Sequence, residues 1–73
     1  MIKTNYLVCV KNVGYAASLE LRKLYKRIPD RKAEDHDLVR IIDESGEDYL
    51  YPASNFIPVR LTEKVRKAVA AAI

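Results

Sequence analysis

The chain has 73 residues, of which 49% are hydrophobic and 32% charged, and it carries a formal net charge of +3. This length makes a single domain that buries only about 60% of the surface of its unfolded chain, so we expect a modest stability. The composition argues against disorder, and the longest apolar stretch, residues 68–73, is too short to cross a bilayer. The first residues lack the apolar core of a signal peptide, so we expect a cytoplasmic protein without a membrane partner.

The N-terminal part predicts one strand followed by a loop. Tyr6 to Lys11 is an apolar run that favours a buried strand. Cys9 lies in this run as the single cysteine, so no internal disulfide can form and we interpret it as a small core residue. Asn12 to Ser18 contains Gly14, which indicates a turn, and one aromatic residue, Tyr15.

The segment from Leu19 to Ile28 fits two patterns. Its apolar residues recur at helical spacing with Ser18 placed to cap a helix, but residues 24, 26 and 28 also alternate as in a strand. After it, Asp30 is placed to cap a single helical turn that runs through Ala33.

A β-hairpin is predicted in the middle of the chain. Leu38 to Asp43 is rich in β-branched residues, Glu44 to Glu47 is a tight turn in which Gly46 supplies a positive φ, and Asp48 to Tyr51 is the returning strand. Pro52 then ends the ladder because it has no N–H to donate.

Three short elements are predicted to follow the hairpin. Ala53 to Asn55 suits one turn of tight helix, and Phe56 to Val59 starts a last strand. Thr62 is an N-cap candidate for a helix that extends to residue 73. The narrow apolar face of that helix is expected to pack back on the sheet or, as the alternative, to pair with a second copy.

The stretch Tyr51-Pro52-Ala53-Ser54-Asn55-Phe56-Ile57 resembles the C-terminal motif of Src-homology-three domains. In those domains a strand runs into Pro-Ser-Asn-Tyr, which forms one tight helical turn before the last strand closes a barrel. The resemblance implies a mainly β, five-stranded SH3-like small barrel over residues 5–61 and a strand at Leu21 to Ile28. The short C-terminal helix over residues 62–73 is expected from the residue pattern alone. Similar barrels occur in bacterial proteins and in RNA- and ribosome-associated modules.

The sequence also departs from the Src-homology-three pattern. Ala53 is an extra residue, the chain contains no tryptophan for the ligand groove, and Asn12 to Ser18 carries no acid to recognise arginine. The barrel expectation therefore does not extend to proline-rich ligands, and function has to be argued from the site.

Our first functional hypothesis is a non-enzymatic interaction module that binds a protein or peptide partner. Aromatic residues near a proline are typical anchors for extended ligands. Tyr49 and Tyr51 share one strand face, so they are exposed together if Leu50 points inward and are core residues otherwise. The candidate ligand-binding residues are Tyr15, Tyr49, Tyr51, Pro52, Asn55 and Phe56.

The alternative hypothesis is binding of nucleic acid, either RNA or DNA. Residues 22–32 contain six basic side chains and one acid, and Tyr25 is placed to stack on a base. Lys64, Arg66 and Lys67 near the C-terminus could add to the same site. The acidic stretch 34–48, with seven acids and one arginine, would repel the same ligand or pair with the basic stretch. The candidate residues are Arg22, Lys23, Lys26, Arg27, Arg31 and Lys32.

The sequence offers little for catalysis. His36 is the only histidine and stands between two aspartates, and no nucleophile, zinc-ligand pair or phosphate-binding glycine loop is evident. The acids around Gly46 lack the calcium-loop pattern. We therefore expect no catalytic residue, metal or cofactor, and a monomer or weak homodimer.

Overall fold

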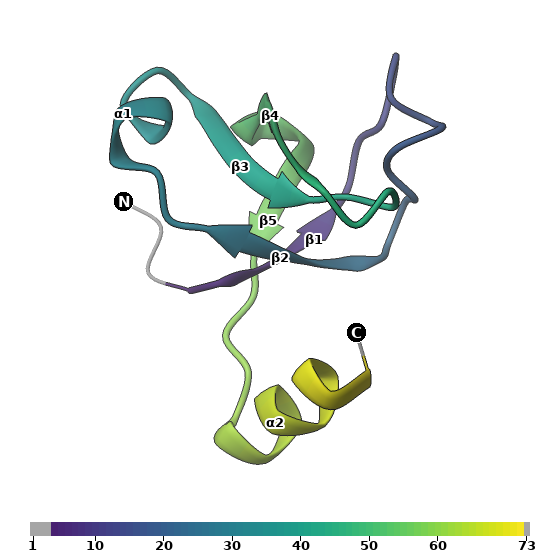
Figure 1. Cartoon of the computed structure of the whole chain (residues 1–73), viewed down its shortest axis with the longest axis vertical. Coiled ribbons are helices and arrows are strands. Elements are labelled where there is room, and N and C mark those ends of the chain that lie inside the picture. Colours follow the sequence, from purple (N-terminus) through teal and green to yellow (C-terminus); the bar gives the residue numbers. More distant parts are fainter. Residues whose placement is uncertain (1–3, 73) are drawn as a thin grey trace.

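The computed structural model describes residues 4–72 and contains five strands and two helices (Figure 1). In chain order the elements are β1 (Tyr6–Cys9), β2 (Leu24–Ile28), α1 (Arg31–Glu34), β3 (Leu38–Ile42), β4 (Asp48–Pro52), a 3₁₀ turn (Ala53–Asn55), β5 (Phe56–Pro58) and α2 (Glu63–Ala72).

The five strands form one antiparallel sheet in the order β4-β3-β2-β1-β5. β2 is shared between its neighbours, because Leu24, Tyr25 and Lys26 pair with β1 whereas Arg27 and Ile28 pair with β3. β4 and β5 lie at opposite ends of this order, so the sheet is open. The predicted mainly β fold of five strands with a C-terminal helix is confirmed, but closure into a barrel is not observed.

The core lies on one face of the sheet, and all five strands and the loop that joins β1 to β2 contribute residues to it. Aromatic rings meet there edge to face, with 6.3 Å between the ring centroids of Tyr25 and Phe56 and also between those of Tyr51 and Phe56. Such packing adds to the burial of apolar area that stabilises the domain. The buried cluster comprises Leu7, Cys9, Leu19, Tyr25, Val39, Ile41, Tyr51 and Phe56.

The ambiguous segment is a loop followed by a strand. β2 begins at Leu24, three residues later than predicted, and the helical interpretation is wrong. Leu19 is fully buried from the loop, whereas Leu21, which a helix would have placed on the apolar face, is exposed. Backbone bonds from Cys9 to Lys23 and from Arg22 to Cys9 attach the end of the loop to β1.

The local turn and cap predictions are confirmed. Gly46 has φ +82° in the turn between β3 and β4, and Gly14 has φ +83°. Asp30 accepts a hydrogen bond from the Ala33 N–H at 3.1 Å at the start of α1. Thr62 Oγ1 accepts from the Val65 N–H at 3.3 Å at the start of α2. These signals depend on neighbours in the chain, which is why sequence alone locates them.

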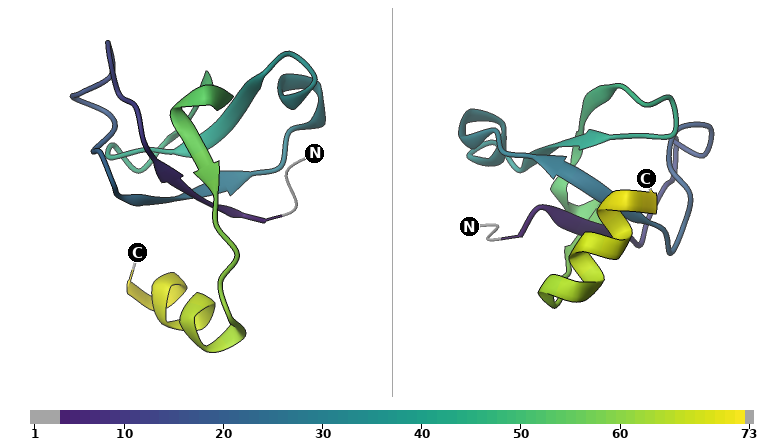
Figure 2. Two further views of the ribbon diagram at one scale, coloured as in Figure 1. Left: turned by 180° about the vertical axis from the view of Figure 1, so that it is seen from behind. Right: turned by 60° about the horizontal axis from the view of Figure 1, so that its bottom comes forward.

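Helix α2 extends away from the sheet on the segment that follows β5 (Figures 1 and 2). The core cluster contains no α2 residue, Val65 is exposed and Val69 is half-buried. The expected packing of its apolar face on the sheet is therefore slight, and its several alanines offer little apolar area for such packing. Within residues 4–72, no helix has the length and apolarity of a membrane span.

Candidate functional site

The predicted aromatic set divides between the core and the surface. Tyr51 is 4% exposed and Phe56 6%, and Asn55 is also buried, whereas Tyr49 is 50% exposed. Tyr15 is 38% exposed and lies edge-on against the Tyr51 ring, with 5.1 Å between centroids. Pro52 is half-buried at the end of β4. Of the six candidates, Tyr15 and Tyr49 thus present the most surface to a partner.

The difference between Tyr49 and Tyr51 comes from their positions along β4. Tyr51 pairs with Val39 over the core, and its hydroxyl donates to Asp43 Oδ2. Tyr49 lies nearer the hairpin turn, and its hydroxyl donates to Glu47 at 3.1 Å. The two rings share a strand face, but only one of them reaches the core.

Asp43 is a buried carboxylate with a complete set of partners. Its Oδ1 accepts from the backbone N–H of Ser45 at 2.8 Å and from the Ser45 hydroxyl, and its Oδ2 accepts from Tyr51. Burial alone would raise the pKa of Asp43, but the hydrogen bonds from Ser45 and Tyr51 outweigh it and hold that pKa below its usual value. Burial and the bond to Asp43 raise the pKa of Tyr51.

We predict that Asp43 makes the protein less stable in acid. A carboxyl whose folded pKa is depressed stabilises the fold above its unfolded pKa of about 3.9, and that contribution is lost as the pH falls through the folded value. Asp43→Asn should therefore lower the thermal midpoint clearly at pH 7 and less at about pH 3, where part of the contribution has been lost. Thermal unfolding followed by circular dichroism at both pH values tests this, and an unchanged gap between variant and wild type would contradict it.

A second carboxylate, Glu44, joins the hairpin turn to β2. Lys23 Nζ lies 2.7 Å from both of its oxygens, and the Tyr25 hydroxyl donates to it. The Lys23 bond, followed by that from Tyr25, lowers the pKa of Glu44. Burial and the bond to Glu44 raise the pKa of Tyr25, whose hydroxyl also accepts the Glu20 N–H at 2.7 Å. Tyr25 is therefore a core residue and is not available to stack on a base.

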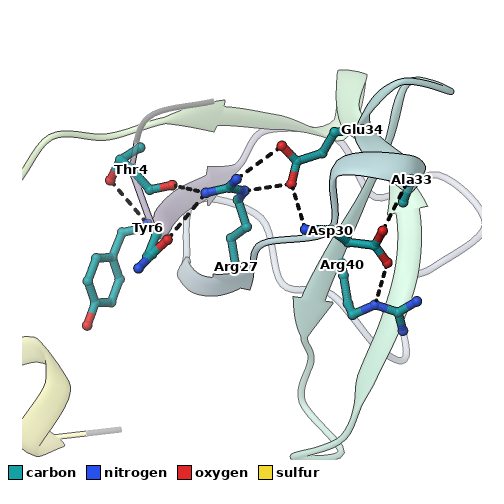
Figure 3. Close-up of polar contacts among 8 residues, drawn as sticks. Thr4, Tyr6, Arg27, Asp30, Ala33, Glu34 and Arg40 are labelled. Carbon is teal, nitrogen blue, oxygen red and sulfur yellow. Dashed lines mark hydrogen bonds and ion pairs between the residues drawn. The ribbon is translucent and has the colours of Figure 1, made fainter. Parts of the chain in front are cut away.

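The predicted basic stretch is also divided. Arg27 is 7% exposed and binds Glu34 through two nitrogens, at 2.9 and 3.0 Å, while it donates to the Thr4 carbonyl at 2.9 Å (Figure 3). The Arg27 bond is the main reason that the pKa of Glu34 is lowered. Lys23 is paired with Glu44. The other four candidates, Arg22, Lys26, Arg31 and Lys32, are exposed and have no ion pair among the described residues.

Arg40 links the acid of the basic stretch, Asp30, to an acid of the acidic stretch, Asp48. Asp30 accepts from Arg40 at 3.0 Å, and Arg40 also donates to Asp48 at 2.9 Å (Figure 3 shows the Asp30–Arg40 bond). Hydrogen bonds from Ala33 and then Arg40 lower the pKa of Asp30. Several acids of the stretch 34–48 are thus already bonded within the fold, mostly near α1 and the hairpin.

A cleft of about 760 Å³ lies between the sheet and α2. Lys26 lines it from β2, Arg60 from the linker, and Arg66 and Lys67 from α2, together with Leu61, Ala70 and the N-terminal residues Thr4, Asn5 and Tyr6. No carboxylate is among these lining residues. Lys26 and Arg66 belong to separate basic stretches of the sequence, and Arg60 was in no predicted site, because only the folded chain brings the three together.

The two edges of the sheet differ in their free backbone donors. The Asp43 N–H bonds to Glu47 O, and the Ala53 N–H bonds to Asp37 O. In this register the backbone N–H and C=O groups of residues 49 and 51 point toward β3. The backbone groups of Asp48 and Leu50 therefore face outward, and within residues 4–72 neither N–H has a partner.

The β5 edge lacks such donors. Asn55 O and the Val59 N–H bond to β1, so the backbone groups of Phe56 and Pro58 point away from β1. The Phe56 N–H bonds to Ala53 O, and Pro58 has no N–H. Only the β4 edge thus offers outward donors from its strand.

These features define a small, mainly β protein with an open sheet, whose β4 edge offers free backbone N–H groups, and with a basic cleft. No group of three or more side chains that would suit a metal ion occurs among residues 4–72. The chain matches no protein-family model, and no curated protein and no solved structure shows significant similarity to it.

Proposed function

We propose that the protein is a non-enzymatic interaction module that binds an extended segment of a protein or peptide partner along the β4 edge. The observation that carries this proposal is the outward-facing N–H of Leu50, flanked by that of Asp48, on a strand whose other side pairs with β3. An extended peptide gains affinity by hydrogen bonding to such an edge and gains specificity from the alternating side chains beside it.

Side chains near this edge support the proposal. Leu50 is 40% exposed and Tyr49 is 50% exposed, and Tyr15 lies over the neighbouring Tyr51. An aromatic and an aliphatic group beside free backbone donors suit an extended chain with apolar residues at alternate positions. Glu47 at the hairpin end forms no ion pair among the described residues, so it favours a partner segment that carries lysine or arginine there.

The proposal includes the SH3-like barrel plan as the architecture of the module. The order of strand, long loop, strand, hairpin, 3₁₀ turn and short strand supports it, as does the return of β5 to pair with β1. So does the sharing of β2 between β1 and β3, because a strand that serves two parts of a sheet is typical of small barrels.

The test is a selection of random displayed peptides on the immobilised protein, followed by titration of the selected peptides against two variants. Leu50→Pro removes one outward N–H and no bond to β3, so the fold should persist. Leu50→Val keeps the N–H and serves as the matched control. We expect Leu50→Pro to weaken binding about tenfold, because a partner carbonyl loses its donor, and Leu50→Val to weaken it much less.

Two outcomes would contradict the proposal. One is that no peptide is enriched on the wild-type protein. The other is that selected peptides bind Leu50→Pro and wild type equally well while circular dichroism shows that both are folded. Peptides that require Tyr15 but not the Leu50 N–H would place the site elsewhere on the surface.

A further inference from the structure

The basic side chains in the cleft between the sheet and α2 form few ion pairs with the described part of the chain. Lys26, Arg60 and Arg66 are exposed and have no ion pair among the described residues. Lys67 lies 3.4 Å from Glu63, with both side chains at least 70% exposed, so this pair leaves the lysine largely hydrated. Four cations therefore converge on one hollow from three segments of the chain, and none of its described lining residues carries a carboxylate.

We propose that this cleft binds the phosphodiester backbone of single-stranded nucleic acid. This site is separate from the β4 edge and shares only Lys26 with the basic stretch 22–32. A positively charged groove that follows a phosphate backbone is the common basis of binding that is independent of sequence.

The size of the cleft favours a strand over a single phosphate ion or a duplex. A volume of about 760 Å³ is far larger than one phosphate needs, and its cations come from both walls. The N-terminus of α2 is not a ready phosphate site, because Thr62 already accepts from its Val65 N–H. Because the cations lie on both walls, a single strand between the walls can meet all four, whereas the rigid convex surface of a duplex meets fewer.

The lining favours nucleic acid over an acidic peptide. Peptide ligands are anchored mainly by apolar groups in pockets. Here the apolar lining is limited to Leu61, Ala70 and the Tyr6 ring, and Tyr6 is 5% exposed. Recognition must therefore come from charge and from arginine, whose planar group binds phosphate oxygens in pairs.

The first experiment measures fluorescence anisotropy of a short labelled oligothymidine as the protein is titrated at several salt concentrations. With about four phosphates neutralised, the logarithm of the binding constant should fall with a slope of about −3 against the logarithm of salt. Affinity should therefore drop about fiftyfold between about 50 and 200 mM salt. Arg60→Gln/Arg66→Gln should reduce the slope to about half.

The matched control is Arg31→Gln/Lys32→Gln, which removes the same charge from two exposed residues of α1 outside the cleft. We expect this variant to bind with nearly the wild-type slope. Equal losses in the two double variants would show that binding follows net charge alone and would overturn the proposal. The thermal midpoints of both variants should match the wild type, since none of the four residues forms an ion pair among the described residues.

Competition distinguishes the other sources of negative charge. Unlabelled oligothymidine should displace the probe, whereas polyglutamate and inorganic phosphate at matched ionic strength should displace it at least tenfold less effectively. Equal displacement by polyglutamate, specific displacement by phosphate, tighter binding of a duplex, or no binding at low salt would each overturn the proposal. Leu50→Pro should leave these titrations unchanged, so failure here is distinct from failure of the peptide proposal.

Discussion

Tyr51→Ala should leave most of the protein unfolded at 25 °C, whereas Tyr49→Ala should leave its stability almost unchanged. Tyr51 is 4% exposed, contacts the rings of Tyr15 and Phe56 and bonds to Asp43. Truncation of a buried aromatic residue costs about 3–5 kcal/mol, which is comparable to the whole stability expected for so small a domain. Replacement of the exposed Tyr49 should cost about 0.5 kcal/mol or less.

Urea unfolding followed by circular dichroism tests this pair of variants. If Tyr51→Ala proves too unstable to purify, Tyr51→Phe keeps the ring and removes only the hydroxyl that Asp43 accepts. We expect it to cost about 1–2 kcal/mol and to lower the thermal midpoint by about 5–10 °C. Equal stabilities for the alanine variants at positions 49 and 51 would show that Tyr51 is not a core residue.

Glu34→Ala should destabilise the protein by about 3–5 kcal/mol, because it leaves the buried Arg27 charge without its carboxylate. The Arg27 and Glu34 side chains are only 8% and 16% exposed, and Arg27 is further fixed by the Thr4 carbonyl and Asn5 Oδ1. Glu34 also accepts the Asp30 N–H at 3.3 Å, so its loss should loosen the start of α1 as well.

Two comparison variants separate the buried charge from general effects. Glu63→Ala removes an exposed ion pair and should cost about 0.5 kcal/mol or less. Arg27→Met/Glu34→Ala removes both charges and should be more stable than Glu34→Ala alone. Chemical unfolding of the three variants measures these differences, and a double variant that is less stable than Glu34→Ala would contradict the role given to the Arg27 charge.

Local sequence signals predicted a large part of the fold. The hairpin at Gly46, the Asp30 cap and the 3₁₀ turn after Pro52 depend on residues within a few positions of one another, and all are present. The start of β2 was predicted too early, because Leu21 fits an apolar pattern but lies in a loop anchored by the buried Leu19. Strand or helix spacing cannot reveal which apolar residues of a loop reach the core.

The candidate sites were harder to predict, because they depend on contacts between distant residues. Arg27 falls in a basic stretch, yet its pairing with Glu34 and Thr4 removes it from the surface. Arg60 belongs to the basic C-terminal stretch, and its place in a site becomes evident only when Lys26 lies near it across the cleft. The free donor of Leu50 depends on which strands lie at the edges of the sheet, and strand order is not encoded in any short motif.

The separation of α2 from the core has a consequence for how the cleft would select its ligands. One wall belongs to the sheet, whereas the other belongs to α2, none of whose described residues is part of the buried cluster. A change in the width of the cleft would therefore cost little folding free energy, and the proposed site would accept strands of different base composition. Binding would restrict the movement of α2 relative to the sheet, which lowers the affinity. We therefore expect a crosslink between α2 and β2 to raise the affinity for a strand and to narrow the range of strands that bind.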